Sequence, residues 1–179
     1  TVMPGQTAER VLMVRPASFG WNPETHASNR FQREVPRLAD DANQRACAEF
    51  DELANLLRNA GVYVFVADDR PSPVCPDAVF PNNWVSFHDD GSVVLYPMMA
   101  PSRRAERRAE PVAQLCNAGF RVTRTIDLSP WEARGEFLEG TGSLVLDRRN
   151  RAAYACLSPR TDAGMLAEFA SKLGYEAVP

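Results

Sequence analysis

The segment WVSFHDDGSVVLY, residues 84–96, places two apolar stretches on either side of an Asp-Asp-Gly sequence. Asp-Gly readily adopts the positive φ angles of a tight turn, so the segment predicts a β-hairpin with strands at residues 84–88 and 93–96. A helical pattern follows at residues 104–117, and a short apolar stretch then predicts a third strand at residues 120–123. The predicted order is strand, strand, helix, strand.

The same order recurs in the rest of the chain. A second hairpin is predicted at residues 143–156, and a helix follows near residues 161–173. The earlier part of the chain predicts a strand at 11–14, a helix at 41–59 and a strand at 62–66, with a long polar loop at 19–40. A loop of that length inside a compact domain is more often functional than idle.

Landmark residues repeat at a constant interval of 58 positions. The matching pairs are Asn59-Ala60-Gly61 with Asn117-Ala118-Gly119, Asp69 with Asp127, Pro101 with Pro159, and Phe80 with Leu138. This periodicity predicts an α/β fold of ββαβ repeats, spanning roughly residues 11–69, 70–127 and 128–179 of one domain at residues 1–179. Three such repeats leave sheet edges exposed, which predicts self-association or completion by a further C-terminal segment.

Composition excludes several classes of protein. The 179 residues are 45% hydrophobic and 24% charged, which is enough apolar surface for a packed core. A net charge of −3 gives no general attraction to nucleic acid or to an anionic membrane. No apolar run is long enough to cross a membrane, and the scattered cysteines fit a reducing cytoplasm. Two histidines and no paired cysteines argue against a histidine-rich metal centre or a zinc site, and no organic cofactor is implied.

Three stretches resemble the guanidino-group-modifying enzymes, the superfamily of arginine deiminase, dimethylarginine hydrolase and amidinotransferases. The stretches are VRPASFG at 14–20 with NPET at 22–25 and NRFQ at 29–32, then PDAVFPNNWVSFH at 76–88, and LEGTGSLVLD at 138–147. The combination is most similar to the citrulline-hydrolase branch. The resemblance implies a five-bladed α/β propeller (pentein), of which this chain would hold about three blades.

The resemblance also implies a chemistry. A cysteine thiolate attacks the central carbon of a guanidino or ureido group, ammonia or an amine leaves, and water releases the covalent adduct. The family's catalytic histidine and nucleophilic cysteine belong to later blades, so both are expected outside this chain. By the same resemblance, Glu139 is the catalytic carboxylate that orients the histidine and holds substrate N–H groups.

Substrate-binding residues follow from the same motifs. Asp77 matches the first substrate-binding aspartate, and an acceptor-only carboxylate suits N–H donors. Asn83 stands at the second aspartate, and Asn82 stands where another acid is common. An amide both donates and accepts, so these two residues favour a neutral, citrulline-like head group over a cationic one. Considered alone, Asn-Asn equally fits a polar turn.

Two arginines align with residues that bind the substrate α-carboxylate. Arg103 and Arg160 occupy near-equivalent places after the outer strand of successive hairpins, and a guanidinium fork suits a carboxylate. The alternative for Arg103 is a solvated basic helix face. The loop at 19–32 resembles a substrate-covering lid with Asn22, Glu24 and Asn29 as its polar contacts, although a structural loop explains each of these residues as well.

Cys75 and His88 do not predict a catalytic pair. His88 is expected to be exposed at a turn or bonded to backbone, and Cys75 has no basic neighbour to lower its pKa. The remaining cysteines, Cys47, Cys116 and Cys156, are expected in the core.

The leading hypothesis is a hydrolase of a C–N bond in a citrulline- or arginine-like amino acid. A non-catalytic amino-acid-binding module and an amidinotransferase of the same superfamily remain the alternatives.

Overall fold

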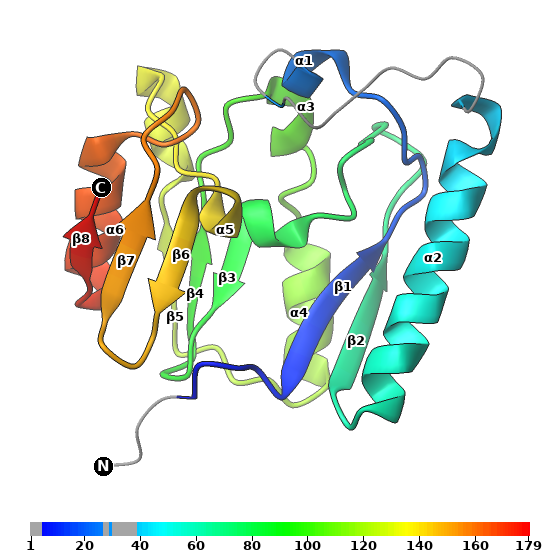
Figure 1. The fold of residues 1–179 in the computed structure, drawn as a ribbon, viewed down its shortest axis with the longest axis horizontal. Helices are drawn as coiled ribbons and strands as arrows, with labels where there is room; N and C mark the ends of the chain where they lie inside the picture. The colour runs from blue at the N-terminus through cyan, green and yellow to red at the C-terminus, as the bar shows by residue number, and fades with distance from the viewer. Residues whose placement is uncertain (1–4, 27–28, 30–38) are drawn as a thin grey trace. The chain divides into compact units, whose positions relative to one another are not determined.

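Two three-stranded sheets repeat one topology in the computed structural model, which describes residues 5–26, 29 and 39–179 (Figure 1). In the first sheet, β3 (Val85–Phe87) pairs antiparallel with β4 (Ser92–Leu95), and β5 (Arg124–Asp127) adds parallel to β4. In the second, β6 (Leu144–Asp147) pairs antiparallel with β7 (Ala152–Ala155), and β8 (Glu176–Val178) adds parallel to β7. The mixed α/β class and both predicted hairpins are confirmed.

A third, smaller sheet has two strands. β1 (Arg10–Arg15) pairs in parallel with β2 (Tyr63–Asp68), and α2 (Ala39–Asn59) connects them and packs against both. A parallel pair needs such a crossover connection, because a tight turn would leave the second strand antiparallel to the first. The loop predicted at 19–40 contains α1 (Pro23–His26), whereas residues 27–28 and 30–38 lie outside the described part of the chain.

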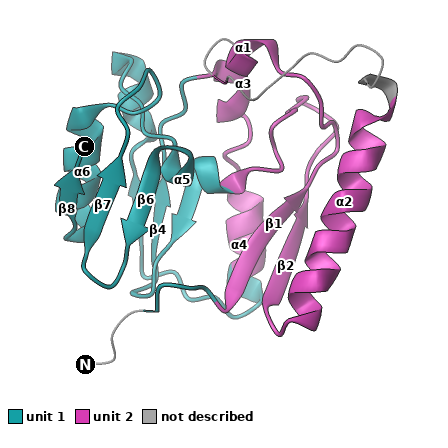
Figure 2. Cartoon of the chain, in the orientation of Figure 1, with its two compact units in different colours: residues 1–8, 82–99, 116–179 teal, residues 9–81, 100–115 magenta. Residues whose placement is uncertain are grey.

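The chain divides into two compact units (Figure 2). Unit 1 comprises residues 1–8, 82–99 and 116–179 and holds both three-stranded sheets. Unit 2 comprises residues 9–81 and 100–115 and holds the two-stranded sheet.

Each unit has its own apolar core. In unit 1, α6 (Ala163–Leu173) packs on β7 and β8 and contributes Phe169, which is 1% exposed. Asp162 begins this helix, because its carboxylate accepts a hydrogen bond from the Met165 amide at 3.0 Å. In unit 2 the core is smaller and centres on Val14, Ala67, Cys75 and Ala78.

Two predicted element bounds are wrong. The strand expected at 120–123 begins instead at Arg124, because its partner β4 begins at Ser92, which pairs with Arg124. The helix expected at 104–117 is two helices, α3 (Pro101–Arg104) and α4 (Ala109–Asn117). Pro111 explains the break, because its ring would clash with the carbonyl four residues earlier in a continuous helix.

Four predicted environments are also wrong. Cys116 and Cys156 are exposed rather than in the core, and Cys47 is half-buried. His88 is 7% exposed, whereas the turn position predicted exposure or a backbone bond, because its ring lies between Ser86 and the Arg148 side chain. None of the helices in the described residues combines the length and apolarity needed to cross a membrane.

Candidate functional site

Asp77 is the centre of a polar cluster in unit 2. The residue is 9% exposed, and Oδ2 of its carboxylate accepts a hydrogen bond of 2.7 Å from the side-chain amide of Asn22. The Thr25 hydroxyl lies 3.3 Å from the same oxygen. Both partners come from the segment that forms α1, and Asn22 is only 2% exposed. The rotamer of Asp77 is therefore held through one oxygen, and no partner within the described residues contacts the other oxygen.

Arg103 lies beneath Asp77 as part of a buried ion pair. Its Nε and Nη2 donate to the two carboxylate oxygens of Glu106 at 3.0 and 2.9 Å. Nη2 also donates to the carbonyl oxygens of Asp77 and Phe80 at 3.3 and 3.4 Å. Each residue of the pair is 3% exposed, so the alternative of a solvated basic face for Arg103 is wrong.

Burial raises the pKa of Glu106, and the bidentate contact with Arg103 opposes that rise. Arg103 Nε also lies 3.9 Å from Asp77 Oδ2. In this arrangement the guanidinium contacts both the backbone carbonyl and the carboxylate of Asp77. Glu106 was not among the residues predicted from the sequence, although its spacing three residues after Arg103 is typical of an ion pair on one helical face.

Glu24 links α1 to the beginning of α3. Its Oε2 accepts a hydrogen bond of 2.8 Å from the Ser102 amide, and this bond lowers the pKa of the Glu24 carboxyl. Ser102 Oγ also accepts from Asn22 Nδ2 at 3.2 Å. Asn29 is half-buried, and its amide donates to the His26 carbonyl.

A second group of predicted residues lies in unit 1 around Glu139. This side chain is 2% exposed, and its Oε1 accepts a hydrogen bond of 3.1 Å from the Met99 amide. Arg160 Nη1 donates to Oε2 at 3.3 Å. A buried carboxylate needs such partners, because an unpaired charge away from water costs several kcal/mol.

Asn82 and Asn83 approach the turn that follows Glu139. Asn83 is 9% exposed, and its Nδ2 lies 3.5 Å from the Glu139 carbonyl oxygen. Asn82 Nδ2 donates to Thr141 Oγ1 at 2.9 Å. A Cβ at Gly142 would lie 2.3 Å from Asn83 Nδ2, so a larger residue there would force the Asn83 side chain to move.

The predicted residues thus form two groups, one in each unit. Unit 2 brings together Asn22, Glu24, Asp77 and Arg103, with Asn29 nearby in sequence. Unit 1 brings together Asn82, Asn83, Glu139 and Arg160. Thr25, Ser102 and Met99 complete these groups and were not predicted, because backbone and hydroxyl contacts between distant segments leave no pattern in the sequence.

Of the four cysteines, all of them described, Cys75 is buried, Cys47 is half-buried, and Cys116 and Cys156 are exposed. Burial raises the pKa of the Cys75 thiol to about 11, and neighbouring Glu106 and Asp69 act in the same direction. A thiol with this pKa is almost entirely protonated at neutral pH and is a poor nucleophile. Among the described residues, no group of three or more His, Cys, Asp or Glu side chains could hold a metal ion.

Comparison with known proteins gives one family and a shared fold. The model of a family described as N,N dimethylarginine dimethylhydrolase, eukaryotic, matches residues 15–179. The N-terminal domain of ArgZ, an arginine dihydrolase from cyanobacteria, superposes with a TM-score of 0.68 at 21% identity, covering 94% of this chain and 56% of that one.

Two further solved structures have the same fold. AgrE in a ternary complex with ornithine and NAD+ gives a TM-score of 0.66 at 19% identity, with 94% of this chain and 22% of that one covered. A dimethylarginine dimethylaminohydrolase adduct gives 0.64 at 16% identity, with 96% and 59% covered. This chain therefore spans little more than half the length of the shorter of these structures. No curated protein sequence matches it.

Proposed function

The chain belongs to the N,N dimethylarginine dimethylhydrolase family, and from this premise we propose that it supplies the substrate-binding part of a C–N hydrolase acting on a citrulline- or arginine-like amino acid. In this chemistry a thiolate adds to the central carbon of the ureido or guanidino group, ammonia or an amine departs, and water cleaves the resulting adduct. We place the nucleophile and catalytic histidine outside these 179 residues, because the chain covers only 56% of the ArgZ domain on which it superposes, and burial raises the pKa of the Cys75 thiol.

The proposal rests on the carboxylate of Asp77, because only one of its two oxygens has a hydrogen-bond partner among the described residues. Asn22 and Thr25 hold Oδ2, while Oδ1 has no partner among the described residues. A fixed, acceptor-only oxygen is suited to the N–H donors of a ureido or guanidino head group. Arg103 and Glu106 support this orientation from the buried side. In our proposal the lid contacts are Asn22, Glu24 and Asn29.

The roles in unit 1 follow from Asn83 and Glu139. Asn83 offers both an N–H donor and a carbonyl acceptor, which matches a neutral ureido group better than a guanidinium cation. Asn82 lines the same turn through its bond to Thr141. Glu139 orients the reacting groups, and of the two arginines predicted for the substrate carboxylate, the more accessible Arg160 takes that role, whereas the buried Arg103 supports Asp77.

Isothermal titration calorimetry with citrulline, arginine and ornithine tests the binding part of the proposal. We expect citrulline to bind more tightly than arginine, and Asp77→Asn to weaken citrulline binding at least tenfold, because the substitution removes the charged acceptor. Asp41→Asn is the matched control, since Asp41 is an exposed aspartate of the same unit. Equal binding by the Asp77→Asn and unsubstituted proteins would refute the assignment.

Asn83→Asp tests the preference for a neutral head group. The new carboxylate should shift the preference from citrulline toward arginine. An ammonia-release assay on the same samples separates the alternatives. Release of ammonia by these 179 residues alone would contradict the external nucleophile, whereas binding without turnover is expected for the substrate-binding part.

A further inference from the structure

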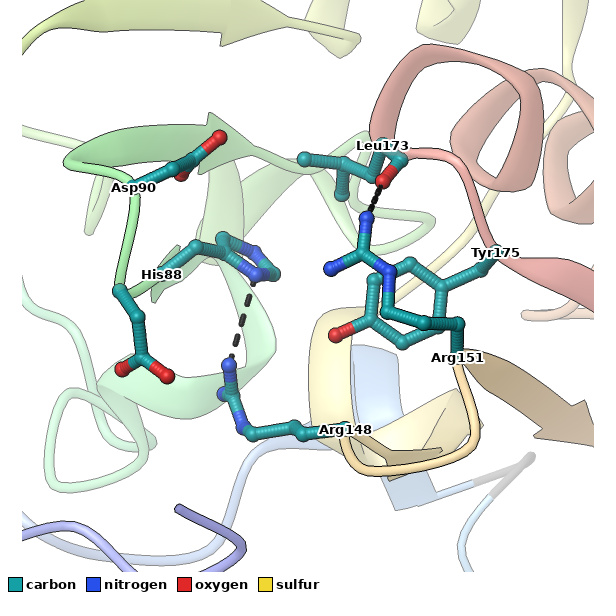
Figure 3. Close-up of a pocket in the computed structure, with 7 residues that line it drawn as sticks. His88, Asp90, Arg148, Arg151, Leu173 and Tyr175 are labelled. Carbon is teal, nitrogen blue, oxygen red and sulfur yellow. Dashed lines mark hydrogen bonds between the residues drawn. The ribbon is translucent and has the colours of Figure 1, made fainter. Parts of the chain in front are cut away.

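A second pocket lies in unit 1, at the opposite ends of the strands from Asn83 and Glu139. Asn83 comes just before β3 and Glu139 before β6, whereas this pocket forms at the turns that follow those two strands. Its volume is about 220 Å³. The polar and aromatic side chains that line it are His88, Asp89, Asp90, Arg148, Arg151 and Tyr175 (Figure 3).

Arg148 points into the pocket from the turn after β6 (Figure 3). Its Nη1 lies 3.4 Å from His88 Nδ1, and its amide donates to the side-chain oxygen of Gln6 at 2.9 Å. Within the described residues no carboxylate forms an ion pair with its guanidinium. Because a guanidinium carries five N–H donors and no acceptor, the single contact with His88 leaves most of its donors for a ligand.

His88 is neutral at physiological pH in this arrangement. Burial lowers its pKa to about 4, and the Arg148 charge acts in the same direction. Its Nε2 lies 2.9 Å from Ser86 Oγ, which in turn lies 2.7 Å from the Tyr96 hydroxyl. An arginine can only donate, so the contact with Arg148 requires a lone pair on Nδ1 and places the ring proton on Nε2.

Arg151 supplies a second, rigidly held cation. Its backbone is left-handed, with φ of 59°, and its guanidinium carbon lies 4.3 Å from the centre of the Tyr175 ring. Nε donates to the Gly174 carbonyl at 3.3 Å, and Nη2 donates to the Leu173 carbonyl at the end of α6. Stacking and these two bonds fix the side chain before any ligand arrives (Figure 3).

The two aspartates at the rim compensate these charges only in part. Asp90 is already engaged by the Ser92 amide at 2.9 Å and by Arg124 at 3.4 Å. Asp89 is exposed, and no hydrogen bond or ion pair of its side chain is found among the described residues. Two guanidinium groups thus face one uncompensated carboxylate, which leaves a local excess of positive charge.

We propose that this pocket is a binding site for a small carboxylate, held by Arg148 and Arg151. The free N–H groups of Arg148 match the two oxygens of a carboxylate in a bidentate geometry. A monoanion neutralises the excess charge, whereas a dianion such as phosphate would be repelled more strongly by Asp89. The site is independent of the substrate-binding function proposed above, because it uses none of the same residues.

Nuclear magnetic resonance of the histidine rings tests the proposal at pH 7, because the chain has only two histidines. The probe is sodium acetate, compared with sodium chloride at equal ionic strength. We expect acetate to shift the His88 ring resonances in a saturable way, since a bound carboxylate draws the Arg148 guanidinium away from Nδ1. The resonances of His26, which lies in unit 2, should stay unchanged.

Substitutions separate this site from general electrostatics. Arg148→Gln should weaken the apparent acetate affinity at least tenfold, whereas Arg149→Gln, at an exposed arginine of the same turn, should leave it unchanged. If Arg148→Gln does not fold, as judged by circular dichroism, Arg148→Lys replaces it. Lysine keeps the charge without the planar fork, so it should weaken binding severalfold.

Three results would overturn the proposal. The first is a His88 resonance that does not respond to acetate. The second is acetate binding that is equal in the unsubstituted protein and in whichever Arg148 variant folds. The third is a response to inorganic phosphate where acetate has none, which would refute the carboxylate assignment.

Discussion

His88 makes the stability of unit 1 depend on pH in a predictable direction. Its pKa falls from an ordinary value of 6.5 to about 4 in the folded chain, mainly because of burial and secondarily because of Arg148. Asp90 and Asp89 oppose the shift, and Arg151 adds to it. Between these two pKa values the unfolded state binds the proton and the folded state does not, so stability decreases as the pH falls.

The magnitude follows from the two pKa values. The contribution is fully present above pH 6.5, decreases by about 2 kcal/mol between pH 7 and pH 5, and reaches a limiting loss of about 3 kcal/mol near pH 4. Other carboxyl groups titrate in the same range. The contribution of His88 is therefore the difference between the unsubstituted protein and His88→Gln, which cannot titrate.

Urea unfolding at a series of pH values measures this difference. Tryptophan fluorescence reports the transition, and two of the three tryptophans, Trp84 and Trp131, belong to the same unit as His88. We expect the free energy of unfolding of His88→Gln to lose about 2 kcal/mol less than that of the unsubstituted protein from pH 7 to pH 5. His26→Gln, which removes the other histidine of the chain, is measured over the same pH range for comparison. An identical pH dependence for His88→Gln and the unsubstituted protein would refute the reasoning.

Three further predictions concern local structure. Gly140→Ala should destabilise the protein by about 2 kcal/mol or more in urea unfolding, because the new Cβ would overlap the carbonyl of Asn82 at a positive φ of 43°. Gly20→Ala is the control: no atom lies within 4 Å of the new Cβ, so the free energy of unfolding should change by about 0.5 kcal/mol or less. Asp162→Ala should cost about 1 kcal/mol through loss of the N-cap of α6, and an unchanged melting temperature would contradict that role. Iodoacetamide at pH 7.5 should modify the two exposed thiols and spare Cys75 in the native chain, as mass spectrometry of the peptides would show.

The sequence predicted the order of elements in both three-stranded sheets, whereas the described residues of 11–69 contribute only the parallel pair β1–β2. The Asp-Asp-Gly turn and the 58-residue interval predicted the hairpins and the helix that follows each of them, and β3–β5 and β6–β8 confirm that order. These features are local, because turn chemistry and hydrophobic period act within one element. The start of β5 was wrong because it depends on the register of a neighbouring strand.

The candidate residues were found by motif, but their contacts were not. From the sequence, Arg103 fits a solvated helix face as well as a buried ion pair. The buried contact with Glu106 decides in favour of the ion pair. His88 likewise fits an exposed turn in the sequence, but in the folded chain its ring contacts Ser86 and Arg148 and is buried. Burial and charge pairing depend on segments far apart in the chain, so the tertiary structure alone decided which of these groups are charged, fixed or open to a ligand.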